Sequence, residues 1–269
     1  MHTTQSADGT TIAFDAVGAG PTIILVTGAL GSRAFDPLLA PLAEQLSTQF
    51  TAVTYDRRGR GDSGDRAPYA VEREIEDIAA LIEQVGERAA LYGISSGAVL
   101  ALDAANHLEH VTQLALYEPP FIIDGSRPPL PEDYVAHLDD LIADGRRGAA
   151  VAYFMTTAIG IPGEYLEPMQ ADPSWKEMEA IAHTLPYDGR VVDGTMSGDP
   201  LPQDRWTALT APTLVVTGGD SDPFFHDGAK ALVDLLPDAR HDVLEGQDHA
   251  VAPEAIAPVL GRFLSGAQR

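Results

Sequence analysis

The sequence contains no cysteine among its 269 residues. The chain can therefore form no disulfide, offer no thiolate nucleophile and bind no metal through cysteine, a composition that fits a reducing compartment. Basic residues are also scarce, because 17 Lys and Arg stand against 40 Asp and Glu, for a formal net charge of −23. A surface this acidic repels nucleic acid and anionic membranes, so we expect neither as a partner.

Long hydrophobic segments are missing as well. No run approaches the roughly 18 apolar residues that a membrane-spanning helix needs. The N-terminal stretch MHTTQSADGTTIAFDAVG lacks the positive start and the apolar centre of a signal peptide. These two absences predict a cytoplasmic protein.

Short apolar runs alternate with helix-like segments along most of the chain. Some runs have the length and β-branched content of strands buried on both faces: 22–28, 51–55, 89–94, 111–117 and 212–218. Further strands are expected at 2–6, 11–17 and 240–246, and helices at 38–46, 75–85, 98–107 and 256–263. The alternation predicts the α/β class, with a mostly parallel central sheet flanked by helices.

The alternation of strands and helices stops after Tyr117. Residues 119–205 are rich in proline and poor in strand pattern, and a strand returns at Pro212. We therefore expect a core built from 1–118 and 206–269, with 119–205 as a helical insertion. Ligands of open α/β sheets bind outside the carboxyl ends of the strands, so an insertion that leaves and returns there would form a lid.

The stretch ALYGISSGAVLAL (89–101) is the strongest candidate for chemistry. Gly93-Ile94-Ser95-Ser96-Gly97 fits G-x-S-x-G at a point where a predicted strand ends and a predicted helix begins. This strand–turn–helix context is that of a nucleophile elbow, which exposes a serine hydroxyl at the sheet edge. The alternative is an ordinary glycine-rich helix start. We favour Ser95 as a nucleophile.

A serine nucleophile needs a base and an acid that orients the base. His249 lies in a loop between the last predicted strand and the last predicted helix, and we predict that it is the base. Asp222 and Asp220 both follow the strand that ends near 218, and Glu118 follows the preceding strand. We favour Asp222 as the acid and keep Glu118 and Asp220 as alternatives.

These residues, in the order Ser, acid, His, resemble the α/β-hydrolase superfamily, in its lid-bearing, esterase-like branch. The resemblance rests on GISSG, GGDSDP (218–223), GQDH (246–249) and YDRRGRGDS (55–63). It implies Ser95 as nucleophile, Asp222 as acid and His249 as base. It also implies an oxyanion hole formed by the backbone N–H groups of Ser96 and Ala29, although Thr27 and Ile94 depart from the residues usual in the family.

Other motifs do not indicate a cofactor. GRGDSG (59–64) fits a dinucleotide-binding pattern, but no apolar helix opens within it, so we expect Arg57 and Asp62 to anchor this loop instead. No metal-binding spacing and no P-loop is present. We expect no cofactor and no metal.

The resulting hypothesis is a serine hydrolase that cleaves small or medium carboxylic esters. Lactone, thioester or C–C bond hydrolysis would use the same triad, and a non-catalytic ligand-binding member of the fold is the alternative of another class. Residues 121–205 carry fifteen Asp and Glu against six Lys and Arg, which favours neutral small-molecule substrates. A buried arginine among Arg146, Arg147 and Arg190 would reverse that preference.

Overall fold

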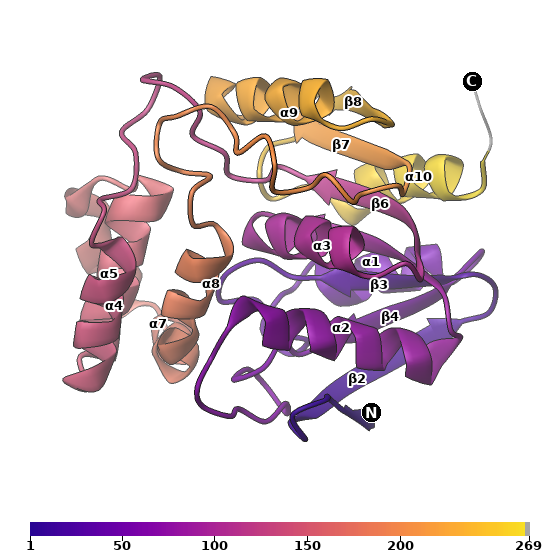
Figure 1. The fold of residues 1–269 in the computed structure, drawn as a ribbon. Coiled ribbons are helices and arrows are strands. Elements are labelled where there is room, and N and C mark those ends of the chain that lie inside the picture. Colours follow the sequence, from indigo (N-terminus) through magenta and orange to yellow (C-terminus); the bar gives the residue numbers. More distant parts are fainter. Residues whose placement is uncertain (267–269) are drawn as a thin grey trace.

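The computed structural model describes residues 1–266, and within them one eight-stranded sheet runs through the molecule (Figure 1). Its strands are β1 (His2–Gln5), β2 (Thr11–Gly18), β3 (Thr22–Val26), β4 (Thr51–Tyr55), β5 (Ala89–Ile94), β6 (Val111–Tyr117), β7 (Thr213–Gly218) and β8 (Ala239–Leu244). They lie in the order β1-β2-β4-β3-β5-β6-β7-β8. Strand β1 pairs antiparallel with β2, and β2 pairs antiparallel with β4. All further neighbours in this order, from β4 to β8, pair in parallel. The predicted α/β class is confirmed.

Helices cover both faces of this sheet, because its central strands are apolar on both sides. The helices of the core are α1 (Leu39–Leu46), α2 (Val71–Val85), α3 (Ser96–His107), α9 (Pro223–Leu235) and α10 (Pro253–Leu264). Helices α2, α3 and α9 share one hydrophobic core with one face of the sheet, and α1 and α10 share a second core with the other face. The helices expected from apolar spacing are confirmed, whereas α9 was not predicted.

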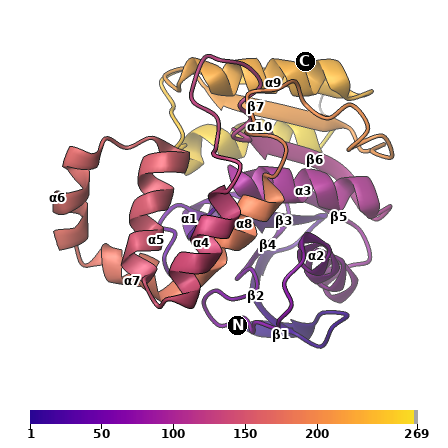
Figure 2. The same cartoon turned by 60° about the vertical axis from the view of Figure 1, so that its left-hand side comes forward.

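The segment between β6 and β7 is helical. It contains α4 (Tyr134–Ala143), α5 (Arg147–Tyr153), a π-helical turn (Phe154–Ile159), α6 (Leu166–Ala171), α7 (Ser174–Ile181) and α8 (Leu185–Val191). Helices α4, α5 and α7 form a hydrophobic cluster of their own and stand to one side of the sheet, with α8 between them and α3 (Figure 2). The two ends of the segment pack on the core of the sheet instead, through residues such as Phe121 and Trp206.

The parallel register brings several loops to one edge of the sheet. The carboxyl ends of β3, β5, β6, β7 and β8 lie at this edge, so the segments that follow them are neighbours. These segments contain Ala29, Ser95, Glu118, Asp222 and His249. In open α/β sheets this is the edge where ligands bind.

Candidate active site

Ser95 occupies a strained turn between β5 and α3. Its backbone has φ 58° and ψ −131°, a conformation that costs a non-glycine residue energy and is concentrated at functional sites. A Cβ atom added to Gly93 would lie 2.4 Å from the Gly97 carbonyl oxygen. A Cβ atom added to Gly97 would lie 2.4 Å from the carbonyl oxygens of Val26 and Thr27. Only glycine fits at these two positions, which is why the G-x-S-x-G pattern accompanies this turn.

His249 is held by a carboxylate, and that carboxylate belongs to Glu118. The Glu118 Oε2 atom lies 2.7 Å from His249 Nδ1, and Glu118 is fully buried. The other carboxylate oxygen, Oε1, accepts the backbone N–H of Gly218 at 2.7 Å. Glu118 itself has a positive φ of 47°, the second strained residue of the site. With Nδ1–H donating to Glu118, the Nε2 atom of His249 is left as a base.

An aromatic ring also orients His249. The Phe225 ring stacks on the imidazole with centroids 5.0 Å apart and planes inclined by 17°. Phe225 belongs to the first turn of α9, directly after the loop that follows β7. The imidazole therefore has a carboxylate at its Nδ1 edge and an apolar ring on one face.

The prediction that Asp222 orients the base requires correction. Within residues 1–266 the Asp222 carboxylate forms no hydrogen bond, and its side chain is exposed at the start of α9. Asp220 is also exposed, and its backbone N–H donates to the Gln247 carbonyl oxygen at 2.9 Å. The alternative at the end of β6, Glu118, occupies the place beside His249 instead.

The end of β6 contacts both the turn that carries Ser95 and the loop that carries His249. The Ser95 N–H donates to the Tyr117 carbonyl oxygen at 3.0 Å, and Glu118, the next residue, binds His249. The Tyr117 hydroxyl donates to the Asp248 carbonyl oxygen at 2.6 Å, which fixes the histidine loop. Within the described residues the Ser95 hydroxyl makes no hydrogen bond to His249. Such contacts are often long in free enzymes and tighten with substrate.

The loop after β3 packs directly against the serine. A Cβ on Gly28 would lie 3.0 Å from Ser95 Cβ, and the following residue, Ala29, lines the same cavity as Ser95. The Ala29 N–H makes no hydrogen bond within residues 1–266. Ser96 is the first residue of α3, so its N–H has no partner within that helix. Ala29 and Ser96 thus line the same cavity as Ser95 and carry backbone N–H groups that make no hydrogen bond within residues 1–266.

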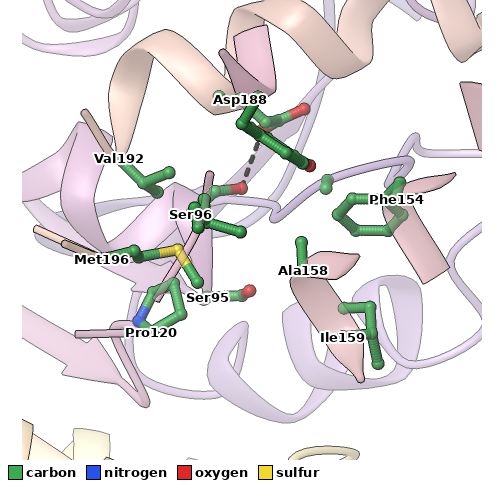
Figure 3. A pocket seen from close by; sticks show the side chains of 13 residues that line it. Ser95, Ser96, Pro120, Phe154, Ala158, Ile159, Asp188, Val192 and Met196 are labelled. Carbon is green, nitrogen blue, oxygen red and sulfur yellow. Dashed lines mark hydrogen bonds between the residues drawn. The ribbon is translucent and has the colours of Figure 1, made fainter. Parts of the chain in front are cut away.

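The cavity beside Ser95 is small and largely apolar. Its interior space is about 40 Å3. Figure 3 shows the hydroxyl of Ser95 among apolar side chains, among them Pro120, Phe154, Val192 and Met196. Asp188 is the one ionisable carboxylate in the wall, and Ser96 donates to it. Most of the lining comes from the helical insertion.

Buried charges lie behind this wall. Arg57 and Arg60 follow β4 and are each about 1 % exposed, and both donate to Asp188 of α8. Arg57 also binds Glu74 at 2.7 Å, so it ties its loop to α2 and does not pair with Asp62. Asp62 pairs with Arg33 at 2.9 Å instead. Nothing in the local sequence around Asp188 marked it as part of the site.

The described residues also show what the site does not bring together. In residues 1–266 no group of three or more His, Cys, Asp or Glu side chains is arranged to hold a metal ion. Over the same part of the chain, no helix is both long enough and apolar enough to cross a membrane.

Known proteins of similar sequence and structure share this architecture. A solved alpha/beta hydrolase from Sphaerobacter thermophilus DSM 20745 is 52% identical, with a TM-score of 0.89 over 98% of this chain and 100% of its own. RutD of Caulobacter sp. (strain K31), which bears the name of a carbamate hydrolase, is 28% identical over 91% of both chains. The uncharacterized hydrolase YraK of Bacillus subtilis (strain 168) is 34% identical over 43% of this chain and 44% of its own length. Residues 23–259 match the alpha/beta hydrolase family, and the chain belongs to that family.

Proposed function

We propose that the protein is a serine hydrolase that cleaves small or medium-sized carboxylic esters through an acyl-enzyme. Ser95 is the nucleophile, His249 the general base and Glu118 the acid that orients it. The observation that carries this proposal is the 2.7 Å contact between Glu118 and His249 Nδ1, at the sheet edge where Ser95 is held in a strained turn.

The reaction follows from these positions. Ser95 Oγ attacks the ester carbonyl carbon while His249 Nε2 takes its proton, and the carbonyl oxygen becomes an oxyanion facing the N–H groups of Ala29 and Ser96. The imidazolium, stabilised by Glu118, then protonates the departing alcohol and leaves an acyl-Ser95 ester. Water attacks this ester with His249 again as base, and the acid is released as Ser95 recovers its proton.

The cavity supports a neutral, largely apolar substrate. Its wall is apolar apart from Ser95, Ser96, Asp188 and the Tyr134 side chain. A cavity of about 40 Å3 favours a small acyl or alcohol group over a bulky one. Residues 119–205 act as a lid in this proposal, because their helices supply most of the wall and close the cavity over the carboxyl ends of the strands. Lactones present the same carbonyl and use the same steps.

A fluorophosphonate probe tests the proposal. The probe should modify Ser95 of the wild type stoichiometrically, and esterase activity should fall in proportion to the labelling. The Ser95→Ala variant should neither be labelled nor hydrolyse p-nitrophenyl esters. Ser221→Ala removes another serine hydroxyl at the same sheet edge and should label normally. A wild type that is not labelled, or a Ser95→Ala variant that keeps activity, would favour a ligand-binding member of the family.

A further inference from the structure

Asp188 connects the helical insertion to the residue after the nucleophile. It lies on α8, is 4% exposed, and its Oδ1 accepts both the Ser96 hydroxyl and Arg57 Nη1 at 2.7 Å (Figure 3). Its Oδ2 accepts Arg60 Nη2 at 2.5 Å. Ser96 and Asp188 are 92 residues apart in the sequence, so this contact exists only when the insertion is docked on the sheet.

The two arginines continue from Asp188 to the loop after β3. Arg60 Nη1 donates to the Gly28 carbonyl oxygen at 2.6 Å and to that of Gly31 at 3.3 Å. Arg57 Nη1 donates to the Thr27 carbonyl oxygen at 3.3 Å. These three carbonyl groups lie on both sides of Ala29 in the chain. The orientation of the Ala29 peptide is therefore set by guanidinium groups that Asp188 holds.

The charges make this arrangement depend on Asp188. Arg57 has a second partner, since Glu74 accepts from its Nε and Nη2 at 2.7 Å. Among the described residues Arg60 has Asp188 as its one ion-pair partner, and its buried Nε has no hydrogen bond. Burial raises the pKa of Asp188, but Arg57 and Arg60 outweigh this and hold it below its ordinary value. Removing the carboxylate would leave the Arg60 charge buried without compensation.

We infer that Asp188 is a positioning residue for both oxyanion donors. Through its hydrogen bond to Ser96 it fixes the start of α3, and through Arg60 and Arg57 it fixes the loop that carries Ala29. The helical insertion thereby takes part in building the oxyanion hole in addition to covering the cavity. The inference rests on the proposed function, because it concerns the donors of that reaction.

The test separates binding of the oxyanion from binding of the substrate. Asp188→Asn keeps the shape of the side chain and removes its charge, and Arg60→Lys keeps the charge but cannot span Asp188 and Gly28 together. A trifluoromethyl ketone forms a hemiketal with Ser95 in which its carbonyl oxygen becomes the oxyanion. Each variant should lower kcat by about 10²-fold, as the loss of one oxyanion donor does, with KM within about threefold. The inhibition constant of the ketone should rise in parallel with the loss in kcat/KM.

Asp103→Asn is the matched control. Asp103 is a buried carboxylate on the same helix as Ser96, and it pairs with Arg205 at 2.7 Å and accepts the Trp206 indole N–H at 2.7 Å, away from the cavity. This variant should lose stability as Asp188→Asn does, yet keep kcat and ketone affinity in the folded protein. Arg60→Lys carries the test if Asp188→Asn does not fold.

Three results overturn the inference, and they are distinguishable. In the first, the wild type reacts with fluorophosphonate, but the kcat and ketone affinity of both variants stay within about twofold of the wild-type values. This result overturns the role of Asp188 and leaves the proposed function standing. An equal loss in Asp103→Asn does the same, because the effect would then be general destabilisation. A wild type that neither reacts with fluorophosphonate nor binds the ketone overturns the proposed function, and this inference with it.

Discussion

The backbone N–H of Gly218 donates to Glu118 Oε1 at 2.7 Å, while the other oxygen of that carboxylate lies 2.7 Å from His249 Nδ1. Each oxygen of Glu118 thus has one fixed partner, and the side chain spans the ends of β6 and β7. A carboxylate held in this way needs no movement to orient the imidazole. Its positive φ of 47° is the local cost of placing it there.

Glu118→Gln should therefore abolish most of the activity without unfolding the protein. The amide oxygen can still accept from Gly218, but the amide group then donates to His249 and holds the wrong tautomer. Loss of the orienting acid in a serine triad lowers kcat by about 10⁴-fold. Steady-state kinetics on a p-nitrophenyl ester, with the melting temperature as a check on folding, measures this.

Asp222→Asn is the matched control for that change. Asp222 is exposed and forms no side-chain hydrogen bond within residues 1–266, so kcat should stay within about twofold of the wild type. A large loss in Asp222→Asn together with a mild effect of Glu118→Gln would return the acid to the loop after β7.

Phe225→Leu should lower kcat more than it raises KM. The stacked ring keeps the imidazole in one orientation, and a misplacement of about 1 Å can cost up to about 10²-fold in rate. Phe224→Leu removes the neighbouring ring, which lies under Arg127 at 4.6 Å and serves as the control. Equal kcat values for the two variants would show that the stacking on His249 does not orient the base.

The sequence predicted the parts of the site that depend on local structure. The strained turn at Ser95 is predictable because the glycines, the strand before it and the helix after it all lie within a few residues of one another. The sequence favours Asp222 as the acid because it follows a predicted strand and precedes a proline, as the acid does in the family it resembles, while Glu118 at the end of the preceding strand is an alternative. The contact between Glu118 and His249 joins residues 131 positions apart, so no local pattern in the sequence specifies it.

Other parts of the site have no local signal. Asp188 meets Ser96 across 92 residues, and its surroundings, PYDGR, carry no motif. Phe225 belongs to α9, which apolar spacing did not reveal. The fold itself was accessible because buried strands and amphipathic helices repeat a simple pattern, whereas contacts between the insertion and the core depend on how two packed units dock.

The stability contributed by Asp188 should depend on pH. Its pKa in the folded protein is lowered because Arg57 and Arg60 outweigh the effect of burial. A lowered folded-state pKa gives stability that is present above the unfolded value of about 3.9 and is lost as the pH falls through the folded one. Asn resembles the protonated acid, so the free energies of unfolding of the wild type and Asp188→Asn should differ by about 3–5 kcal/mol at pH 7 and converge in acid.

Urea unfolding of both proteins between pH 3 and pH 7 measures this difference. Asp139→Asn removes a partly exposed carboxylate that pairs with Arg190 at 2.6 Å, and it should follow the wild type closely at every pH. A gap between wild type and Asp188→Asn that is the same at pH 3 and at pH 7 would contradict an ionised Asp188.

Neutral esters should be preferred over esters that carry a carboxylate. None of the three arginines considered as anion-binding groups lines the cavity beside Ser95. Arg190 pairs with Asp139, Arg147 donates to the Ala180 carbonyl oxygen at 2.6 Å, and Arg146 borders a separate surface groove. The one carboxylate in the cavity wall, Asp188, is already paired with Arg57 and Arg60, and the chain has a net charge of −23. We expect kcat/KM to be about tenfold higher for a neutral ester than for a matched anionic one at low salt.

Added salt should narrow that preference, because long-range repulsion is screened over about 10 Å at 0.1 M ionic strength. The measurement compares kcat/KM for a neutral diester with kcat/KM for the corresponding monoester, which carries one free carboxylate. Both are measured at 10 mM and at 500 mM NaCl, for the wild type and for Arg127→Gln. Arg127 lines the adjoining groove, which shares Ile159 with the cavity beside Ser95. An anionic ester preferred at low salt, with the preference lost in Arg127→Gln, would show that this arginine rather than the net charge selects the substrate.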